Sequence, residues 1–473
     1  MSNTEISNSS RPFLTFFEEI SKIPRGSGNT KNIADYLESF AKKRSLDYIR
    51  DKADNVIIKK NATVGYEGRP CVIIQGHTDM VIQKEPGATI DVEREGVKLV
   101  YDGDFIRADG TTLGADDGIA VAYALAILDS EEIPHPDIEA VFTTDEEIGL
   151  IGATALDTSN LRGRVMINID SDDEGVFTVG CAGGRRLDIT LPVVKECAVG
   201  EKYSLIIDGL KGGHSGIEID KGRTNAIKRL AEYLVSIPDA RLISFDGGVA
   251  DNAIPAFAVA EFSSLLGSLA ISDIIDKVRL SISEKNESEN ITLAKAGVAE
   301  NMLTRESTEN LLSLIMDIPS GVVAMSSDIE GQVETSLNLG IIKLGEGNAE
   351  ITLSLRSAIG AEKEKLAKAV GETAKSRGAD VFEHGDYPAW EYRKDSPLRD
   401  VMCRVYREMY GKDANVITIH AGLECGIFSD KTEGLDCVSA GPDAFDIHTP
   451  KERLSISSAV RFWEFLIEVL KNI

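Results

Sequence analysis

Five short stretches of this sequence bring together histidine and carboxylate residues, the residue types that hold divalent metal ions. The stretches are HTD at 77–79, DD at 116–117, DEE at 145–147, DSDDEG at 170–175 and HTP at 448–450. Asp116 and Asp117 stand near the start of a long apolar run, Leu113–Ser130, that predicts a buried helix. Unpaired carboxylates are almost never buried, and the partial charge of a helix N-terminus cannot neutralise two acids. The pattern therefore predicts bound cations and, taken with the other stretches, a two-metal hydrolytic centre.

Such a centre assigns different tasks to its residues. Two divalent ions about 3.5–4 Å apart can clamp both the attacking water and the polarised carbonyl oxygen of a substrate. They need histidine and carboxylate ligands, a shared carboxylate, a separate carboxylate as base, and an acid that orients a ligating imidazole. His77 and Asp79 have the spacing of an imidazole and its orienting acid, and Asp116 suits the shared position. Glu146 and Glu147 follow an apolar strand, where adjacent side chains point opposite ways and can divide the roles of base and ligand.

Each of these residues also has an ordinary structural interpretation. His77 could be a buried histidine satisfied by an acid, Asp116 a helix cap, Glu146–Glu147 a solvated turn, and Asp170 a turn cap. His448 is one of only six histidines, and Pro450 would help to fix its loop. Because five residues of the ligand type fall at strand or loop ends, the joint pattern favours the metal centre over five unrelated structural roles.

Composition limits the possible partners. The chain has 473 residues, with 51 Lys and Arg against 77 Asp and Glu, and a formal charge of −26. This balance argues against a nucleic-acid partner, because phosphate binding is mostly neutralisation by Lys and Arg, and it disfavours anionic membrane surfaces. No run approaches the roughly 20 apolar residues of a membrane helix. Six scattered cysteines and a polar N-terminus without a secretory signal predict reduced thiols and a cytoplasmic location.

The spacing of strands and helices predicts an α/β fold. Short apolar runs separated by helical patterns are expected to be strands: 55–60, 70–76, 138–144 and 164–169. This alternation predicts a mostly parallel sheet with helices on both faces, and we expect a loop over 102–118 before the apolar helix. Ligands of such sheets bind beyond the carboxyl ends of the strands, where the polar stretches lie.

The pattern changes after about residue 195, where strands and helices predict an α+β unit. We therefore expect a discontinuous catalytic domain of residues 1–195 and 390–473, with an inserted lid domain at 196–389. Within the insertion, a strand–helix–strand order occurs twice, and an internal duplication is one interpretation of it.

The blocks also resemble a known superfamily. The order H-T-D-M-V, T-L-G-A-D-D-G, T-D-E-E-I-G, N-I-D-S-D-D-E-G, G-G-H-S-G and H-T-P is similar to that of the co-catalytic-zinc aminopeptidase/carboxypeptidase superfamily. The residues within these motifs are most similar to those of the aminoacyl-histidine (Xaa-His) or cytosol non-specific dipeptidase branch. The resemblance extends from about residue 10 to the end of the chain. The resemblance implies metal-dependent hydrolysis of dipeptides, including carnosine-like Xaa-His dipeptides. Two Zn²⁺ ions would serve, with Mn²⁺ or Co²⁺ as alternatives.

The resemblance implies roles for individual residues. His77 and Asp170 would hold one ion, Glu147 and His448 the other, with Asp116 bridging and the Asp116–Asp117 peptide bond cis. Glu146 would be the general base that takes a proton from the attacking water, and Asp79 the partner of His77.

For the inserted domain, the resemblance implies that His214 stabilises the oxyanion of the tetrahedral intermediate. Asn252 and Arg356 would clamp the substrate, with Arg356 taking its terminal carboxylate. Glu424 would meet the amino group of the substrate or act as a structural carboxylate. A plain loop histidine is the alternative for His214.

Other functions use the same residues. A tripeptide aminopeptidase or an N-acyl amino-acid deacylase would share the metal ligands, and a catalytically silent metal-binding scaffold is the alternative outside enzymes. The presence of Glu146, which a silent relative could lose without losing metal, argues against the scaffold. The small peptide substrate is the expected partner. Whether the chain forms a homodimer, and whether His214 acts in its own chain or on a partner chain, stays open.

Overall fold

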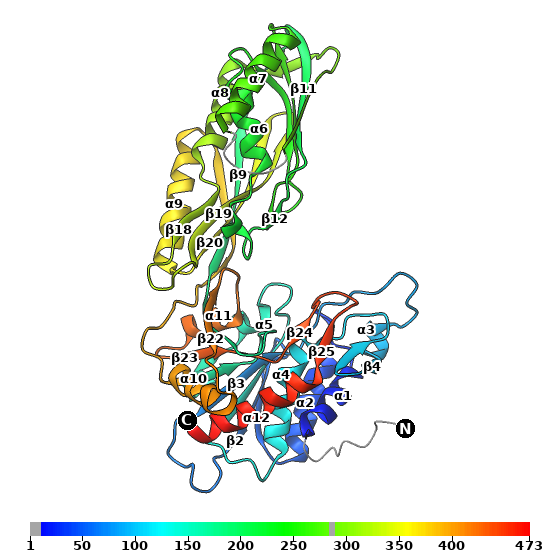
Figure 1. Ribbon diagram of the computed structural model, residues 1–473, viewed down its shortest axis with the longest axis vertical. Helices are drawn as coiled ribbons and strands as arrows, with labels where there is room; N and C mark the ends of the chain where they lie inside the picture. Colours follow the sequence, from blue (N-terminus) through cyan, green and yellow to red (C-terminus); the bar gives the residue numbers. More distant parts are fainter. Residues whose placement is uncertain (1–10, 283–288) are drawn as a thin grey trace. The chain divides into compact units, whose positions relative to one another are not determined.

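The computed structural model describes residues 11–282 and 289–473, which divide into two compact units (Figure 1). Unit 1 contains the described residues up to Gly180, Tyr392–Thr418 and Leu423–Ile473, and unit 2 contains Cys181–Glu391 and Ile419–Gly422. Each unit has its own hydrophobic core. The division falls before residue 195, because β9 (Gly183–Pro192) pairs with strands of unit 2.

Unit 1 is built on an eight-stranded sheet in the order β1-β2-β6-β3-β7-β23-β8-β22. Its central strands β6, β3, β7 and β23 pair in parallel, whereas β1–β2, β2–β6 and β23–β8 are antiparallel. The predicted α/β class is confirmed, with the parallel strands at the centre of the sheet. The strands are β1 (Asp47–Arg50), β2 (Val56–Lys60), β3 (Val72–His77), β6 (Ile138–Thr143), β7 (Val165–Asn168), β8 (Val176–Cys181), β22 (Asn415–Ile419) and β23 (Asp436–Ser439).

Burial explains why the central strands are continuous apolar runs. Val72 and Ile74 point into the main core of unit 1, and Ile73 points to the other face and is equally buried. Strands covered on both faces are rich in apolar residues, and the buried polar residues among them, such as Gln75 and Glu139, have hydrogen-bond partners. α4 (Ala115–Asp129) contacts β3, and its residues from Asp117 to Leu128 are all buried, as predicted for this helix. The other long helices of the unit are α1 (Pro12–Ser21), α2 (Lys31–Lys43), α10 (Pro397–Tyr410) and α12 (Ile456–Asn472).

The prediction of a loop over residues 102–118 is wrong in part. It contains β5 (Phe105–Ala108), which pairs with β4 (Leu99–Asp102) and with β25 (Arg453–Ser455). The pairing with β4 is local, whereas β25 lies far away in sequence. The same small sheet includes β24 (Ala444–Phe445) beside β25, and the HTP stretch connects these two strands. This pairing anchors the loop that carries His448.

Unit 2 has a nine-stranded sheet, in the order β16-β11-β15-β13-β19-β20-β9-β21, with β18 added on β19. Its pairs are antiparallel, and the four helices α6–α9 make it the expected α+β unit. The strands are β11 (Glu201–Asp208), β13 (Arg241–Gly247), β15 (Ala258–Ser264), β16 (Asn290–Lys295), β18 (Gly321–Met325), β19 (Val333–Leu344), β20 (Asn348–Ser357) and β21 (Asp380–Tyr387). The helices are α6 (Ala226–Val235), α7 (Ser268–Ile282), α8 (Arg305–Asp317) and α9 (Gly360–Ser376). The sequence also predicts a helix over 270–284, and its last two residues, 283 and 284, lie outside the described residues. The internal duplication stays a prediction.

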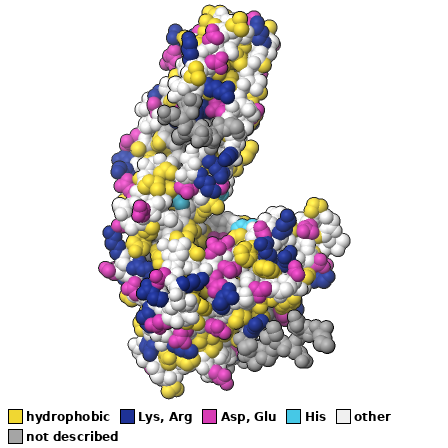
Figure 2. Space-filling model, viewed as in Figure 1, with side chains coloured by type: hydrophobic (Ala, Val, Ile, Leu, Met, Phe, Trp, Pro, Cys, Tyr) yellow, Lys and Arg dark blue, Asp and Glu magenta, His cyan; other side chains and the backbone are white. Residues whose placement is uncertain are grey.

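The surface mixes charges of both signs. On the face visible in Figure 2, acidic side chains are interspersed with Lys and Arg. Among the helices of the described residues, none combines the length and the apolar character needed to cross a bilayer.

Candidate metal centre

The parallel strands of unit 1 bring the predicted ligands to one edge of the sheet. His77 is the last residue of β3, Glu146 and Glu147 follow β6, and Asp170 follows β7. In the parallel register His77 lies opposite Thr143, so the carboxyl ends of these strands coincide. This edge is where open parallel sheets bind ligands.

Two ligand groups share Asp116. His77, Asp116 and Asp170 form one group, and Asp116, Glu147 and His448 form the other, with the ligand atoms of each group within 4.8 Å of one another. The Asp116 Oδ1 atom lies 3.0 Å from His77 Nε2, and its Oδ2 atom lies 3.0 Å from His448 Nε2. Glu147 Oε1 lies 2.9 Å from the same His448 nitrogen. The shared carboxylate thus has one oxygen directed at each group, which is the arrangement expected of a bridging ligand.

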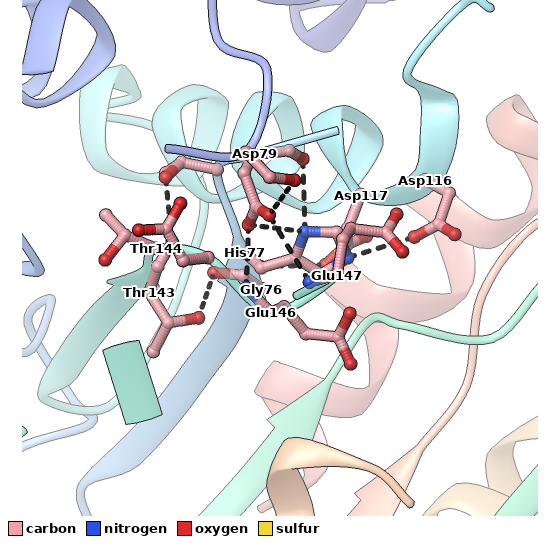
Figure 3. A network of polar contacts seen from close by, with 12 residues as sticks. Gly76, His77, Asp79, Asp116, Asp117, Thr143, Thr144, Glu146 and Glu147 are labelled. Atoms are coloured by element: carbon pink, nitrogen blue, oxygen red, sulfur yellow. Dashed lines mark hydrogen bonds and ion pairs between the residues drawn. The ribbon is translucent and has the colours of Figure 1, made fainter. Parts of the chain in front are cut away.

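Asp79 orients the imidazole of His77. The His77 Nδ1 atom lies 3.2 Å from the backbone carbonyl oxygen of Asp79 and 3.4 Å from its carboxylate Oδ1 atom, and the Nε2 atom is directed at Asp116 (Figure 3). Asp79 is itself fixed, because its carboxylate accepts hydrogen bonds from the Ser27 hydroxyl and from the backbone N–H groups of Glu146 and Glu147. A carboxylate on the far nitrogen holds a ligating histidine in one tautomer and orientation.

Glu146 lies beside the same ligands. A third group of possible ligand atoms joins His77, Glu146 and Glu147. Glu147 is the glutamate that contacts His448, which is compatible with the predicted division of roles, ligand for Glu147 and base for Glu146. Burial, with neighbouring acids, raises the pKa of the Glu146 carboxyl to about 8 in the protein without ions. Bound cations would favour its ionised form, the form that accepts a proton.

The buried acidic groups at this edge of the sheet would be stabilised by bound cations. Burial, aided by neighbouring acids, raises the pKa values of Asp117 and Asp170 well above their ordinary range. Among the described residues, no hydrogen-bond partner reaches the buried Oδ2 atom of Asp170. Hydrogen bonds to Asp116 and Glu147 raise the pKa of His448 to about 10. A set of imidazole nitrogens and crowded carboxylate oxygens suits Zn²⁺, Mn²⁺ or Co²⁺, so the residues present fit two divalent ions.

The backbone between the two aspartates has the predicted form. The Asp116–Asp117 peptide bond is cis, as the resemblance implied. The helical dihedral angles of α4 begin only after Asp117, whose Oδ2 atom accepts the backbone N–H of His77 at 3.1 Å. Asp116 makes no capping hydrogen bond to the helix, since its oxygens face the histidines instead.

Glu424 lies beneath the ligands and is completely buried. Its Oε2 atom accepts hydrogen bonds of 2.6 Å from Gln75 Nε2 and from the Thr143 hydroxyl. Gln75 in turn accepts a hydrogen bond from Asn168, so the carboxylate closes a polar network across β3, β6 and β7. Burial raises the pKa of Glu424 to about 7. Full burial favours the structural role for Glu424 over contact with the amino group of a substrate.

His214 lies in unit 2, and its hydrogen bonds define its tautomer. Its Nδ1 atom accepts the backbone N–H groups of Gly216 at 3.0 Å and Ile217 at 3.3 Å. Because Nδ1 is an acceptor, the proton of the neutral ring is on Nε2. Burial and the positive charge of Arg356 lower the pKa of His214. The ring is therefore held neutral with one free N–H donor.

The other two predicted residues also lie in unit 2. Asn252 is exposed on a turn, and the Asn338 amide donates hydrogen bonds of 2.8 Å to the carbonyls on either side of it. The guanidinium of Arg356 donates to the Tyr387 hydroxyl at 2.9 Å. Sequence reasoning missed the supporting residues Asn338 and Tyr387, as it missed Gln75 in unit 1, because none of them belongs to a recognisable motif.

Comparisons with known proteins agree with this geometry. The sequence model of a family described as "Peptidase family M20/M25/M40" matches residues 73–472. The cytosol non-specific dipeptidase of Escherichia coli (strain K12) is 36% identical over 476 residues, which cover 98% of each chain. The crystal structure of aminoacylhistidine dipeptidase from Vibrio alginolyticus superposes with a TM-score of 0.92 at 33% identity, covering 98% of this chain and 97% of that one. An aminopeptidase PepT from Bacillus cereus shares the fold, with a TM-score of 0.59, 17% identity and 98% of each chain covered.

Proposed function

The chain belongs to peptidase family M20/M25/M40, and from that membership we propose that it is a metallodipeptidase with two bound divalent cations. The observation that carries the proposal is the pair of ligand groups sharing Asp116, with Glu146 beside them, in a chain that matches a dipeptidase along its whole length. When bound, the cations would polarise the scissile carbonyl and lower the pKa of a water molecule. His77 and Asp170 would hold one, Glu147 and His448 the other, and Asp116 both. Zinc is the proposed metal.

Glu146 acts as the general base in this proposal. Its carboxylate takes a proton from the attacking water and passes it to the leaving amine, so Glu146 ends the reaction in the ionised form in which it began. Asp79 holds His77 in its orientation, and its hydrogen bonds to the backbone of Glu146 and Glu147 keep both glutamates in place. These contacts support the division of roles, because the Asp79 carboxylate positions both the ligand His77 and the base Glu146.

In this proposal, His214 donates a hydrogen bond to the carbonyl oxygen of the substrate. Its Nε2–H group is free while Nδ1 is occupied by two backbone donors, which supports this role. A hydrogen bond aimed at charge that develops only in the tetrahedral intermediate accelerates the chemical step. Arg356 pairs with the terminal carboxylate of the dipeptide, and Asn252 contacts the substrate beside it. Unit 2 acts as the lid in this proposal.

The proposed substrates are dipeptides, including those with a C-terminal histidine. The E. coli relative is named a non-specific dipeptidase and the Vibrio protein an aminoacylhistidine dipeptidase, and both names support this range. The first name also supports a cytoplasmic location. We propose no nucleic-acid partner, since the formal charge is −26.

The proposal is tested by metal content and a substrate panel. The purified chain is analysed for zinc, manganese and cobalt, then assayed on carnosine-like Xaa-His dipeptides, other dipeptides, tripeptides and N-acyl amino acids, with and without a chelator. Chelator-sensitive hydrolysis of dipeptides supports the proposal. Preference for tripeptides or N-acyl amino acids would assign the same metal residues to another substrate class. If the chain binds metal ions but hydrolyses none of these substrates, the result would identify it as a metal-binding scaffold.

A further inference from the structure

A buried carboxylate outside the ligand set holds the backbone on which Asp116 stands. Glu452 is only 2% exposed. Its Oε2 atom accepts the backbone N–H groups of Leu113 at 2.8 Å and Gly114 at 3.0 Å, and its Oε1 atom accepts those of Ala115 at 2.8 Å and Asp116 at 3.4 Å. One carboxylate thus binds four successive backbone donors that lead into the shared ligand. Charge-assisted hydrogen bonds of this kind are among the strongest in proteins.

A buried guanidinium holds the carbonyl groups of the same region. Arg25, also 2% exposed, donates to the carbonyl oxygens of Thr78 at 3.1 Å, Asp79 at 3.3 Å and Gly114. The Thr78 and Asp79 carbonyls directly follow the ligand His77. Arg25 therefore connects the backbone that follows β3 to the segment 113–116, whose N–H groups donate to Glu452. We call these two residues the backbone clamp.

The glycines of the T-L-G-A-D-D-G block make room for the clamp. A Cβ atom at Gly114 would lie 2.6 Å from the Arg25 Nη2 atom, and one at Gly118 would lie 2.5 Å from it. Real Cβ atoms do not approach other atoms so closely, so any side chain at either position would displace the guanidinium. Arg25, which lies 89 positions before Gly114, thus needs the space at both glycines. Gly114 also has a φ of +70°, and a Cβ atom there would lie 2.6 Å from the Met80 sulfur as well.

The clamp also joins a third ligand-bearing segment. Glu452 follows His448 in the loop between β24 and β25, so its hydrogen bonds connect the loop of one ligand to the backbone of the shared ligand Asp116. Arg25 makes the corresponding connection to the segment that begins at His77. Three segments that are distant in sequence are held together without either residue supplying a ligand atom to the groups described above.

We propose that Arg25 and Glu452 are positioning residues that hold the ligand-bearing segments in place before the ions bind. This inference rests on the proposed function only in taking His77, Asp116 and His448 as ligands. A ligand set that is already ordered loses less conformational freedom when an ion binds, so the affinity for both ions depends on the clamp. Loss of an outer partner of this kind typically weakens metal affinity about 10–100-fold.

The test is a metal titration of variants in both halves of the clamp. Glu452→Gln keeps the shape of the side chain but removes its charge and one acceptor, and Arg25→Lys keeps the charge but loses the planar fork. Glu139→Gln is the matched control. Glu139 is likewise buried in unit 1 and accepts backbone N–H groups, those of Arg162 and Gly163 at 2.9 Å, but it lies near the start of β6, away from the ligand edge.

Each metal-free variant is titrated with zinc in competition with a chelating dye, and its Tm is measured with and without zinc. We expect Glu452→Gln and Arg25→Lys to weaken zinc binding at both sites about 10–100-fold and Glu139→Gln to leave it unchanged. Wild-type affinity in both clamp variants would overturn the inference, as would an equal loss in the control. If Glu452→Gln does not fold, Arg25→Lys decides alone. If neither folds even with zinc, the clamp is a folding element and the inference is wrong. A wild-type chain that binds zinc but hydrolyses no dipeptide would instead overturn the proposed function.

Discussion

Replacement of His214 by alanine tests whether unit 2 takes part in the chemistry. The variant removes one N–H donor, the Nε2–H group that the two backbone hydrogen bonds at Nδ1 leave free. Loss of one such donor costs about 10²–10³-fold in kcat, or about 2.7–4 kcal/mol of transition-state stabilisation. The fold should suffer little, because the ring is half-buried and loses only two hydrogen bonds to a loop, each worth about 1 kcal/mol. We expect kcat on an Xaa-His dipeptide to fall by that factor, with metal content unchanged.

Matched variants separate the hydrogen bond from other effects of the change. His384→Ala removes another histidine of unit 2, one that is 38% exposed and pairs with Asp188, and it should keep wild-type kinetics. His214→Gln places an amide N–H near the position of Nε2 and should recover part of kcat. A near-normal kcat in His214→Ala would refute the reasoning and leave a site built from unit 1 alone. If the protein is a dimer, mixing His214→Ala with Asp116→Ala subunits restores activity only when His214 acts on the partner copy.

Three further predictions concern the metal centre. Glu146→Ala should lower kcat about 10²–10⁴-fold while both ions stay bound, and elemental analysis that finds the variant without metal would make Glu146 a ligand. Asp116→Ala should lower occupancy at both sites, because it removes the shared carboxylate, and two ions per chain in this variant would reject the bridging role. The metal-free protein should lose thermal stability as the pH rises from about 5 to about 10. Its native state binds extra protons at Glu146 (pKa about 8) and His448 (pKa about 10), and the stability they give is lost as the pH rises through these values. Tm measurements with chelator should show this slope, and zinc should reverse it because metal ligands bind deprotonated.

The parts of the fold that the sequence could predict were those with local signals. The strands ending at His77 and Thr143 are continuous apolar runs, and polar residues directly after such runs are unusual. Parallel pairing then places the ends of β3, β6 and β7 at one edge, so strand order alone predicts that His77, Glu147 and Asp170 lie close together. Asp116 at the start of α4 and His448 between β24 and β25 were predicted from their motifs instead. The apolar α4 was equally visible because every residue of its central turns is buried.

The supporting residues could not be predicted, because their partners are distant in sequence. Glu452 binds the backbone of Gly114 across 338 positions, and Gln75 meets Glu424 across 349. Backbone atoms carry no sequence signature, so a carboxylate that binds only N–H groups looks like any other acidic residue. The glycines beside the DD stretch were the available signal for Arg25, and a glycine alone does not say which side chain needs the space. The pairing of β5 with β25 is equally remote, although the hairpin of β5 with β4 is local.

Hydrogen bonds distinguish Glu452 and Asp79 from the two aspartates that we propose as metal ligands. Glu452 accepts four backbone N–H groups and Asp79 accepts three hydrogen bonds, so both carboxylates have donors within the protein. The oxygens of Asp116 face only the two histidines, and within the described residues one buried oxygen of Asp170 has no donor. Both histidines must give up a ring proton before they can bind an ion, and Asp116 then loses the positive charges beside it. Divalent cations are the partners that satisfy both conditions at once, which supports Asp116 and Asp170 as ligands.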